Sequence, residues 1–158
     1  MPIVPVVRFR SAVATAAIAT IATALAGDGA ASTTPTTTLR LDGTPFRPEL
    51  ALTSDQRNLG LMRRSPAPAD GMLFVFPSDT TGGFWMKDTL VPLRILFFDA
   101  AGTRVRKFSM TPCRRDPCPV YDPGRRYRFA LELRALDPRP AKRLGPLAVL
   151  RRLSRTAD

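Results

Sequence analysis

Two acidic side chains, Asp88 and Glu132, are the only pair in the sequence that we nominate for catalysis. Glycoside hydrolysis uses two carboxyl groups that lie roughly 5 to 9 Å apart across a cleft. The pair therefore suggests a hydrolase of cell-envelope polysaccharide. Other catalytic arrangements are missing, since the chain has no histidine and no Gly-x-Ser-x-Gly segment. Gly82-Gly83 alone predicts a turn, not a phosphate-binding loop. The sequence favours a non-catalytic protein and leaves enzyme activity open.

Glu132 stands between Leu131 and Leu133 in a segment typical of a strand, so we expect its carboxylate to be partly covered. An isolated buried charge costs several kcal/mol, so a covered carboxylate must be paired with a cation or hydrogen-bonded. Arg57 or Arg64 is the expected partner. The favoured interpretation is a structural ion pair that fixes a helix onto the sheet, and the alternative is a functional site.

A second cluster of interest surrounds the single tryptophan, Trp85, which precedes Lys87 and Asp88. An aromatic ring supplies contact area in a pocket and neighbouring charges orient a ligand. Ordinary core packing, with polar ends at its rim, is the alternative. The candidate ligand-binding residues are Arg57, Arg64, Trp85, Lys87, Asp88 and Glu132.

Cys113 and Cys118 are the only cysteines and lie inside a proline-rich turn. Four residues separate them, whereas thioredoxin-type redox motifs have two. A zinc site needs about four ligands, usually Cys and His, which this chain cannot supply. We therefore predict a structural disulfide, no metal site and no cofactor.

The N-terminus has the pattern of a secretory signal. Arg8 and Arg10 precede an uncharged run rich in Ala, Ile and Leu, which ends in Ala24-Leu25-Ala26. The run is too short and too weakly apolar for a membrane span, which needs about 20 strongly apolar residues. We predict a signal peptide over residues 1–26, a flexible Gly/Ala/Ser/Thr/Pro linker over 27–38 and one domain over 39–158. The expected location is secreted or periplasmic, with no stable membrane span once the signal is cleaved; retention as an anchor is the alternative.

The domain is predicted to be mainly β, with one short helix near its N-terminal side. Thr53 and Gln56 have the spacing of a capping box, which predicts a helix over 53–62. Apolar or alternating segments of strand length include residues 72–76, 93–98 and 127–134. Many short strands separated by turn residues indicate a compact β-sandwich or barrel-like single domain.

Four segments resemble, in order, the uncharacterised bacterial and archaeal family DUF192, also called UPF0127. They are Arg57-x-x-Gly60-Leu61-Met62-x-Arg64, Gly71-Met72-Leu73-Phe74-Val75-Phe76, Phe84-Trp85-Met86-Lys87-Asp88-Thr89 with Pro92-Leu93, and Ala130-Leu131-Glu132-Leu133. The resemblance covers about residues 39 to 150. It implies a compact, mainly β domain that often follows a signal sequence, and it implies no activity.

The sequence departs from the family pattern at two positions. The family usually has Asn in place of Asp88 and Asp in place of Arg94. The second exchange reverses the local charge, so an acid-dependent site there would be lost or rebuilt. We consider a compensating ion pair between Asp88 and Arg94.

The formal net charge is +11, carried largely by arginine. Arginines scattered along the chain indicate solubility and weak association with anions, rather than a specific binding or catalytic site. One hypothesis is an adhesion module for anionic polymers that uses Arg114, Arg115, Arg125, Arg126 and Arg128. The favoured hypothesis is an exported, non-catalytic binding or accessory domain for a small ligand or an envelope component. Nucleic acid is not expected as a partner of an exported protein.

Overall fold

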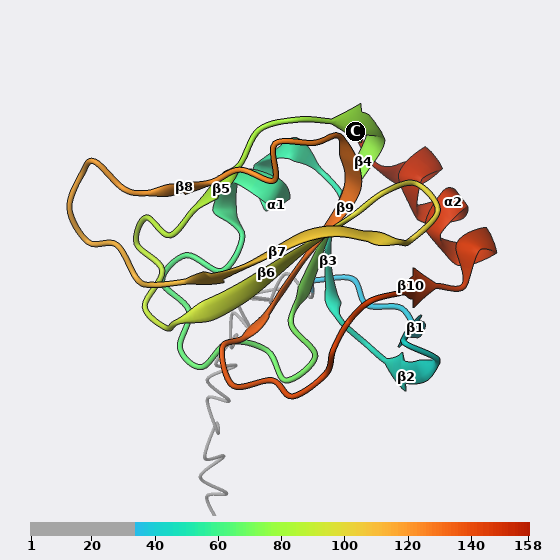
Figure 1. Ribbon diagram of the computed structural model, residues 1–158, viewed down its shortest axis with the longest axis horizontal. Helices are drawn as coiled ribbons and strands as arrows, with labels where there is room; N and C mark the ends of the chain where they lie inside the picture. The colour runs from blue at the N-terminus through green and yellow to red at the C-terminus, as the bar shows by residue number, and fades with distance from the viewer. Residues whose placement is uncertain (1–33) are drawn as a thin grey trace, which may run out of the picture. The chain divides into compact units, whose positions relative to one another are not determined.

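The computed structural model describes residues 34–158 (Figure 1). The predicted signal, residues 1–26, and the first part of the predicted linker lie outside this range. The last linker residues are described and contact the domain. Thr36 forms an isolated bridge with Glu49, and the Pro35 carbonyl accepts a hydrogen bond from the Leu50 amide at 2.8 Å.

The domain is mainly β, as predicted, and is built on a five-stranded sheet with the order β3-β4-β9-β6-β7 (Figure 1). Its strands are β3 (Glu49–Ala51), β4 (Met72–Thr80), β9 (Tyr127–Arg134), β6 (Leu93–Phe98) and β7 (Arg104–Met110). The β3–β4 pair is parallel and the other pairs are antiparallel. The central strands are the three that the sequence marked as apolar or alternating.

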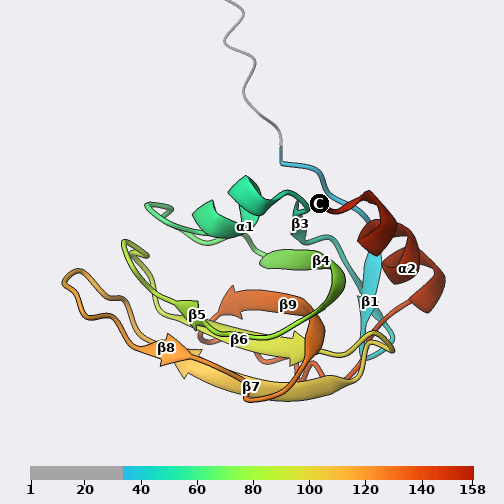
Figure 2. The same cartoon turned by 90° about the horizontal axis from the view of Figure 1, so that it is seen from above.

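Smaller elements flank this sheet. A three-stranded antiparallel sheet has the order β10-β1-β2, and β5 pairs with β8 in a two-stranded ribbon. These elements are β1 (Leu39–Leu41), β2 (Thr44–Phe46), β10 (Leu144–Gly145), β5 (Phe84–Trp85), β8 (Val120–Tyr121), α1 (Ser54–Leu59) and α2 (Leu147–Thr156). Figures 1 and 2 show α1 and the β5–β8 ribbon at one side of the central sheet, with α2 and the three-stranded sheet at the other.

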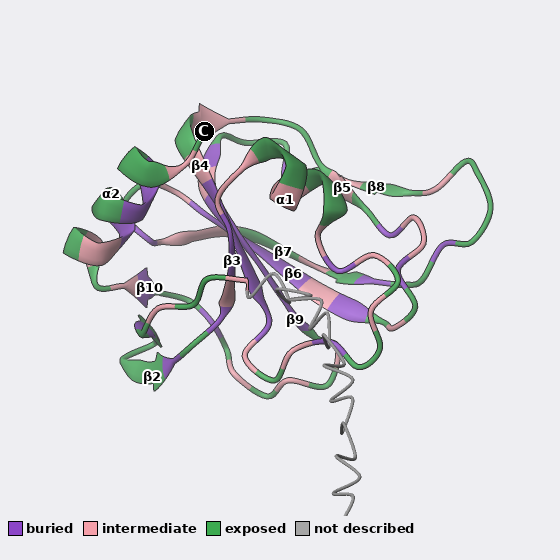
Figure 3. Cartoon of the chain, turned by 180° about the vertical axis from the view of Figure 1, so that it is seen from behind, coloured by how far each residue is buried: buried purple, intermediate pink, exposed green. Residues whose placement is uncertain are grey.

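Both faces of the central sheet are buried, which gives the domain two cores. One core contains Leu73, Leu96 and Leu131 and extends to α2. The other contains Phe74, Phe97 and Ala130 and extends to Cys113. Alternate side chains of a strand point to opposite faces, so runs that are apolar at nearly every position become central strands. Figure 3 shows this buried centre as the purple strands.

Helix α1 begins where the capping box predicted. The Thr53 side chain accepts a hydrogen bond from the Gln56 amide, and the Gln56 side chain accepts one from the Thr53 amide. The helix ends sooner than the predicted Met62, because Gly60 takes a positive φ of 48°. A Cβ at Gly60 would approach the Phe74 ring to 3.2 Å. The glycine thus ends the helix and lets Phe74 pack beneath it.

Gly71 sets the start of β4 against β9. It has a φ of +73°, and a Cβ there would stand 2.0 Å from the Glu132 carbonyl oxygen. Only glycine allows this approach, after which Met72 pairs directly with Glu132 across the sheet. Gly71, in the second motif segment, therefore determines which residues surround Glu132, in the fourth.

Helix α2 was not predicted; the sequence indicated only an apolar segment over 147–150. The helix begins after Pro146, which provides no side-chain cap, and it carries three arginines. Leu150 and Leu153, three residues apart, are buried on one face. Packing of this apolar face against the domain, rather than a capping signal, accounts for the helix.

The predicted disulfide joins Cys113 to Cys118. The Cys113 amide also donates a hydrogen bond to the Met86 carbonyl at 3.1 Å, and the Cys113 carbonyl accepts one from the Asp88 amide at 3.1 Å. The disulfide loop is thereby attached to the segment that follows β5. Among residues 34–158, no helix is long and apolar enough to cross a membrane.

Candidate functional site

A narrow inner pocket lies between α1, the segment after it and β5, on the α1 side of the central sheet. Its buried lining includes Leu61, Phe74, Thr89 and Glu132, and Trp85 stands at its exposed side. The volume is about 40 Å³, enough for about one water molecule or a hydroxyl-sized group. Each of the four motif segments found in the sequence contributes to this lining.

A wider groove of about 450 Å³ adjoins the inner pocket. The two spaces share Arg57, Asn58, Phe84 and Trp85 as lining residues. Trp85 is 50 % exposed, so its ring is available to a ligand. Further lining comes from two aromatic side chains, Phe76 and Tyr127, and two hydroxyl side chains, Ser54 and Thr81.

The aromatic side of the groove is held by edge-to-face ring contacts. The centroids of Phe76 and Tyr127 are 5.4 Å apart, and those of Phe74 and Phe84 are 4.9 Å apart. Burial, with a smaller effect from the Asp122 charge, raises the pKa of Tyr127 to about 12. The Tyr127 hydroxyl is therefore uncharged at physiological pH.

Glu132 occupies the central strand β9, where it pairs with Met72 of β4 and Ile95 of β6. The residue is only 4 % exposed. Burial raises the pKa of its carboxyl to about 8, with no other cause acting on it. The expected ion pair to Arg57 or Arg64 is not formed, since both arginines have other partners. Glu132 is thus a carboxylic acid that stays protonated at neutral pH and can both donate and accept a hydrogen bond.

Arg57 forms part of the groove wall, but its guanidinium is already engaged. It donates to the carbonyls of Leu52 at 2.6 Å and Val75 at 3.0 Å, and also to Asp158. It lies over the Phe76 ring at 5.0 Å. Burial lowers the pKa of Arg57, and the Asp158 charge opposes that effect. Arg57 therefore braces the wall, and its charge is partly offset before any ligand arrives.

The model of the family DUF192, described as an uncharacterised ACR, matches residues 37–136. The chain belongs to the DUF192 family. No curated protein matches the chain. The family assignment confirms the resemblance found in the sequence.

Two solved structures resemble this DUF192 domain. A protein of Sinorhizobium meliloti 1021, described as a "putative transcription regulator", is 31 % identical with a TM-score of 0.60, covering 70 % of this chain and 93 % of its own. A protein of unknown function from Novosphingobium aromaticivorans DSM 12444 is 23 % identical with a TM-score of 0.63, covering 74 % of this chain and 89 % of its own. The fold is shared with both.

Three of the predicted DUF192 site residues line neither the groove nor its inner pocket. Arg64 makes a two-pronged contact with Glu49 of β3, at 2.5 and 2.8 Å; this hydrogen bonding, against a smaller effect of burial, lowers the pKa of Glu49. Lys87 pairs with Asp116 of the disulfide loop. Asp88 pairs with Arg63 at 3.7 Å. The structure thus brings together Arg57, Trp85 and Glu132 and assigns the others to ion pairs.

Sequence reasoning missed several lining residues of this DUF192 site, among them Asn58 and Phe84, which line both the groove and the inner pocket, and Thr89, which lines the inner pocket. Phe84 and Thr89 belong to the tryptophan motif, and Asn58 occupies a variable place in the arginine–glycine motif. For Phe84 and Thr89 the motif positions themselves were the available signal, and Asn58 had none. An aromatic ring or a neutral polar side chain, taken alone, does not indicate a catalytic or ligand-binding role.

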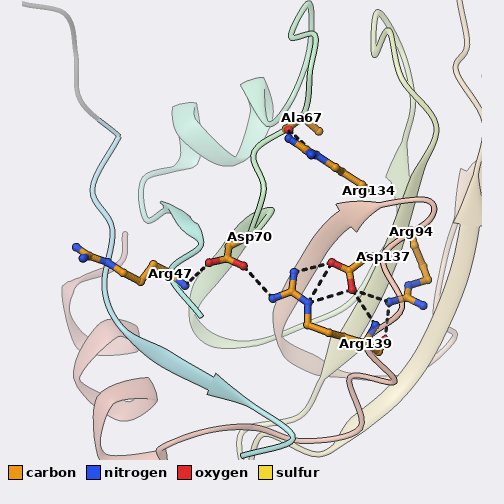
Figure 4. Close-up of polar contacts among 7 residues, drawn as sticks. All are labelled: Arg47, Ala67, Asp70, Arg94, Arg134, Asp137 and Arg139. Carbon is orange, nitrogen blue, oxygen red and sulfur yellow. Dashed lines mark hydrogen bonds and ion pairs between the residues drawn. The ribbon is translucent and has the colours of Figure 1, made fainter. Parts of the chain in front are cut away.

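The proposed pair of Asp88 with Arg94 is wrong, because Arg94 belongs to a different network (Figure 4). Arg94 lies 3.7 Å from the Asp137 carboxylate and donates to the Arg139 carbonyl at 2.6 Å. Arg139 in turn contacts Asp137 at 2.6 Å and Asp70 at 3.0 Å. The positive charge of Arg94 is therefore balanced by Asp137, which lies outside the motif segments.

The arginines considered for adhesion divide into two kinds. Arg114, Arg115 and Arg125 are exposed. Arg126 donates to the Asp79 carbonyl at 2.8 Å, and Arg128 pairs with the Asp79 carboxylate at 2.9 Å. Part of this positive charge is thus committed to holding the β4–β9 end of the sheet.

Proposed function

We propose that this DUF192 protein is an exported, non-catalytic module that binds a small, uncharged, hydroxyl-bearing ligand, such as a sugar unit of the cell envelope. The observation that carries the proposal is the convergence of all four motif segments on one open groove with a protonated carboxylic acid in its inner pocket. Pockets of this kind combine apolar walls with a few polar groups that orient the ligand.

The chemistry of the lining favours an uncharged ligand. Trp85 offers an aromatic face, while Asn58 and Thr81 offer neutral hydrogen-bonding groups. Arg57 is engaged with carbonyls and with Asp158. An anion would find no free cation in this lining, and a cation would find Glu132 protonated. A hydroxyl group, by contrast, can enter the inner pocket and exchange hydrogen bonds with that acid.

The geometry gives less support to hydrolysis by Asp88 and Glu132. Asp88 lines neither space and pairs with Arg63 outside them. Two acids on opposite sides of a bound sugar are the requirement of that mechanism. Binding therefore accounts for the arrangement more simply than cleavage does.

Export rests on the signal pattern of residues 1–26 and agrees with the Cys113–Cys118 disulfide, which is typical of oxidising compartments. An exported protein would meet envelope saccharides rather than nucleic acid. For this reason we do not extend the regulatory description of the Sinorhizobium protein to this chain.

The single tryptophan permits a direct test. We expect Trp85 fluorescence to change saturably when the protein is titrated with glucose, N-acetylglucosamine or cellobiose at pH 6.5. Binding should weaken above about pH 8, as Glu132 ionises. Glu132→Gln keeps a donor and an acceptor, so it should retain binding and lose the pH dependence. Glu132→Leu should abolish binding.

Leu136→Ala is the matched control, because Leu136 is 96 % exposed just beyond β9. It should bind as the parent protein does. Unchanged fluorescence with every sugar, or full binding by Glu132→Leu, would refute the proposal. Calorimetry on Trp85→Ala completes the series, and we expect the heat of binding to be lost.

A further inference from the structure

A second cleft lies on the opposite side of the central sheet, between α2, the β6–β7 turn and the ends of β4 and β9. Its volume is about 670 Å³, within the range of small-molecule sites. None of its lining residues belongs to the groove of Trp85 and Glu132. The helix that forms one wall, Leu147–Thr156, lies beyond the segment matched by the DUF192 model.

The charged residues of this cleft are all basic. Arg128 comes from β9, and Arg151 and Arg155 come from α2. Arg128 is paired with Asp79 at 2.9 Å. Arg151 and Arg155 stand four residues apart and therefore on the same helix face, where like charges repel. Helix α2 contains no acidic residue that could relieve this repulsion.

A buried hydroxyl adds an independent observation. Ser154 belongs to the lining and is 6 % exposed, and its Oγ has no hydrogen-bond partner among the described residues. A buried polar atom without a partner is uncommon in native proteins. The Oγ atom exposes less than 1 Å², so a ligand oxygen in the cleft would accept from this hydroxyl after a rotation of the Ser154 side chain.

The remaining lining is apolar and includes Pro77, Ala101, Phe129 and Leu147. A bare inorganic anion would leave these surfaces in water, while a purely apolar ligand would leave Arg151, Ser154 and Arg155 unused. We propose that this cleft binds an amphiphilic anion, with a phosphate or carboxylate held by Arg151, Ser154 and Arg155 and an alkyl body against the apolar wall. The proposal is independent of the groove function.

Dodecyl phosphate, below its micelle concentration, is a suitable probe for calorimetry with the full chain. We expect saturable one-to-one binding of dodecyl phosphate. Inorganic phosphate, which lacks the alkyl chain, and dodecyl maltoside, which lacks the anionic group, should each bind at least about tenfold more weakly. Arg151→Gln should weaken binding about tenfold, and Ser154→Ala should weaken it several-fold.

Arg152→Gln is the matched control, because Arg152 is the exposed neighbour on the same helix, carries the same charge and does not line the cleft. Its affinity should stay within about twofold of the parent. Equal losses for Arg151→Gln and Arg152→Gln would reveal diffuse attraction and overturn the proposal, as would binding of inorganic phosphate as tight as that of dodecyl phosphate. Thermal unfolding of each variant without ligand identifies any loss of affinity that is caused by misfolding. If Arg151→Gln is unstable, Ser154→Ala, which removes only a hydroxyl group, tests the site instead.

A further arm distinguishes two sources of this chemistry. Sedimentation with phosphatidylglycerol vesicles, compared with phosphatidylcholine vesicles, tests a lipid headgroup. Vesicle binding that Arg151→Gln abolishes supports the site with a lipid as its ligand. Binding of dodecyl phosphate without vesicle binding supports the same site with a soluble amphiphile.

Discussion

Glu132, a buried acid, and Asp137, a half-buried one, lie only five residues apart, yet their ionisation differs. Glu132 lies inside β9, and burial raises its pKa to about 8. The Asp137 side chain, 8 % exposed, follows the end of the same strand. Burial tends to raise the pKa of Asp137 as well, but hydrogen bonds and charge from Arg139, together with the charge of Arg94, outweigh it and lower the pKa.

The difference teaches that lesser burial and a cationic partner together separate the structural acid from the candidate functional one. Beyond the strand, the chain is free to bring Arg139 around Asp137 (Figure 4). Inside the sheet, Met72 and Ile95 flank Glu132 and supply no charge. A buried acid without such a partner costs stability, so Glu132 is the acid that most needs a functional explanation.

The largest expected effect is the contribution of Glu132 to the pH dependence of the free energy of unfolding. Between about pH 4.5 and 8, Glu132 is protonated in the folded chain and ionised in the unfolded chain. Unfolding then releases a proton, so the free energy of unfolding falls as pH rises, by up to about 1.4 kcal/mol per pH unit. Glu132→Gln should lack this contribution and be more stable than the parent at pH 8 by several kcal/mol.

Urea denaturation at pH 5, 6.5 and 8 measures both curves. Similar slopes with pH for the parent and Glu132→Gln would mean that Glu132 is ionised in the fold, and the contrast with Asp137 would disappear.

The next effect concerns the partner of Asp137. Arg139→Ala leaves the Asp137 carboxylate buried without its main cation and also removes the contact to Asp70. We expect a loss of about 3 kcal/mol in the free energy of unfolding at pH 7. Arg152→Ala, an exposed arginine on α2, should change it by less than about 0.5 kcal/mol. If Arg139→Ala lost no more stability than Arg152→Ala, the network would not be needed to hold Asp137.

The smallest effect is expected from Asp137→Asn, which removes the charge and keeps the shape. At pH 7 we expect a loss of about 1.5 kcal/mol. The parent's advantage should vanish as pH falls through the lowered pKa of Asp137, because the carboxylate then takes up a proton in the folded chain too. Thermal melts between pH 2.5 and 7 test this, and a constant gap across that range would contradict the assigned ionisation.

Local features of the fold could be predicted from the sequence. The capping box placed the start of α1, and the apolar run over 93–98 indicated a strand. The proline-rich spacing of Cys113 and Cys118 indicated the disulfide. These features depend on residues close together in the chain, whose physical preferences act directly.

The partners of the charged side chains could not be predicted in the same way. Arg64 meets Glu49 because β3 joins the sheet in parallel beside β4, and Lys87 meets Asp116 because the disulfide loop folds back on it. Both contacts depend on long-range pairing. The groove was predicted in part: Arg57 and Trp85 line it, and Glu132 lines its inner pocket. The neutral role of Glu132 follows only from the apolar neighbours that the sheet register supplies.

The disulfide has a consequence for recognition. Cys113 lies beside Lys87, and Cys118 precedes Val120, which pairs with Trp85. The covalent link therefore brackets the strand that presents the tryptophan. Breaking it would remove the covalent brace from that side of the groove while leaving every contacting side chain in place. On the proposed function, we therefore expect ligand affinity to fall when the disulfide is reduced.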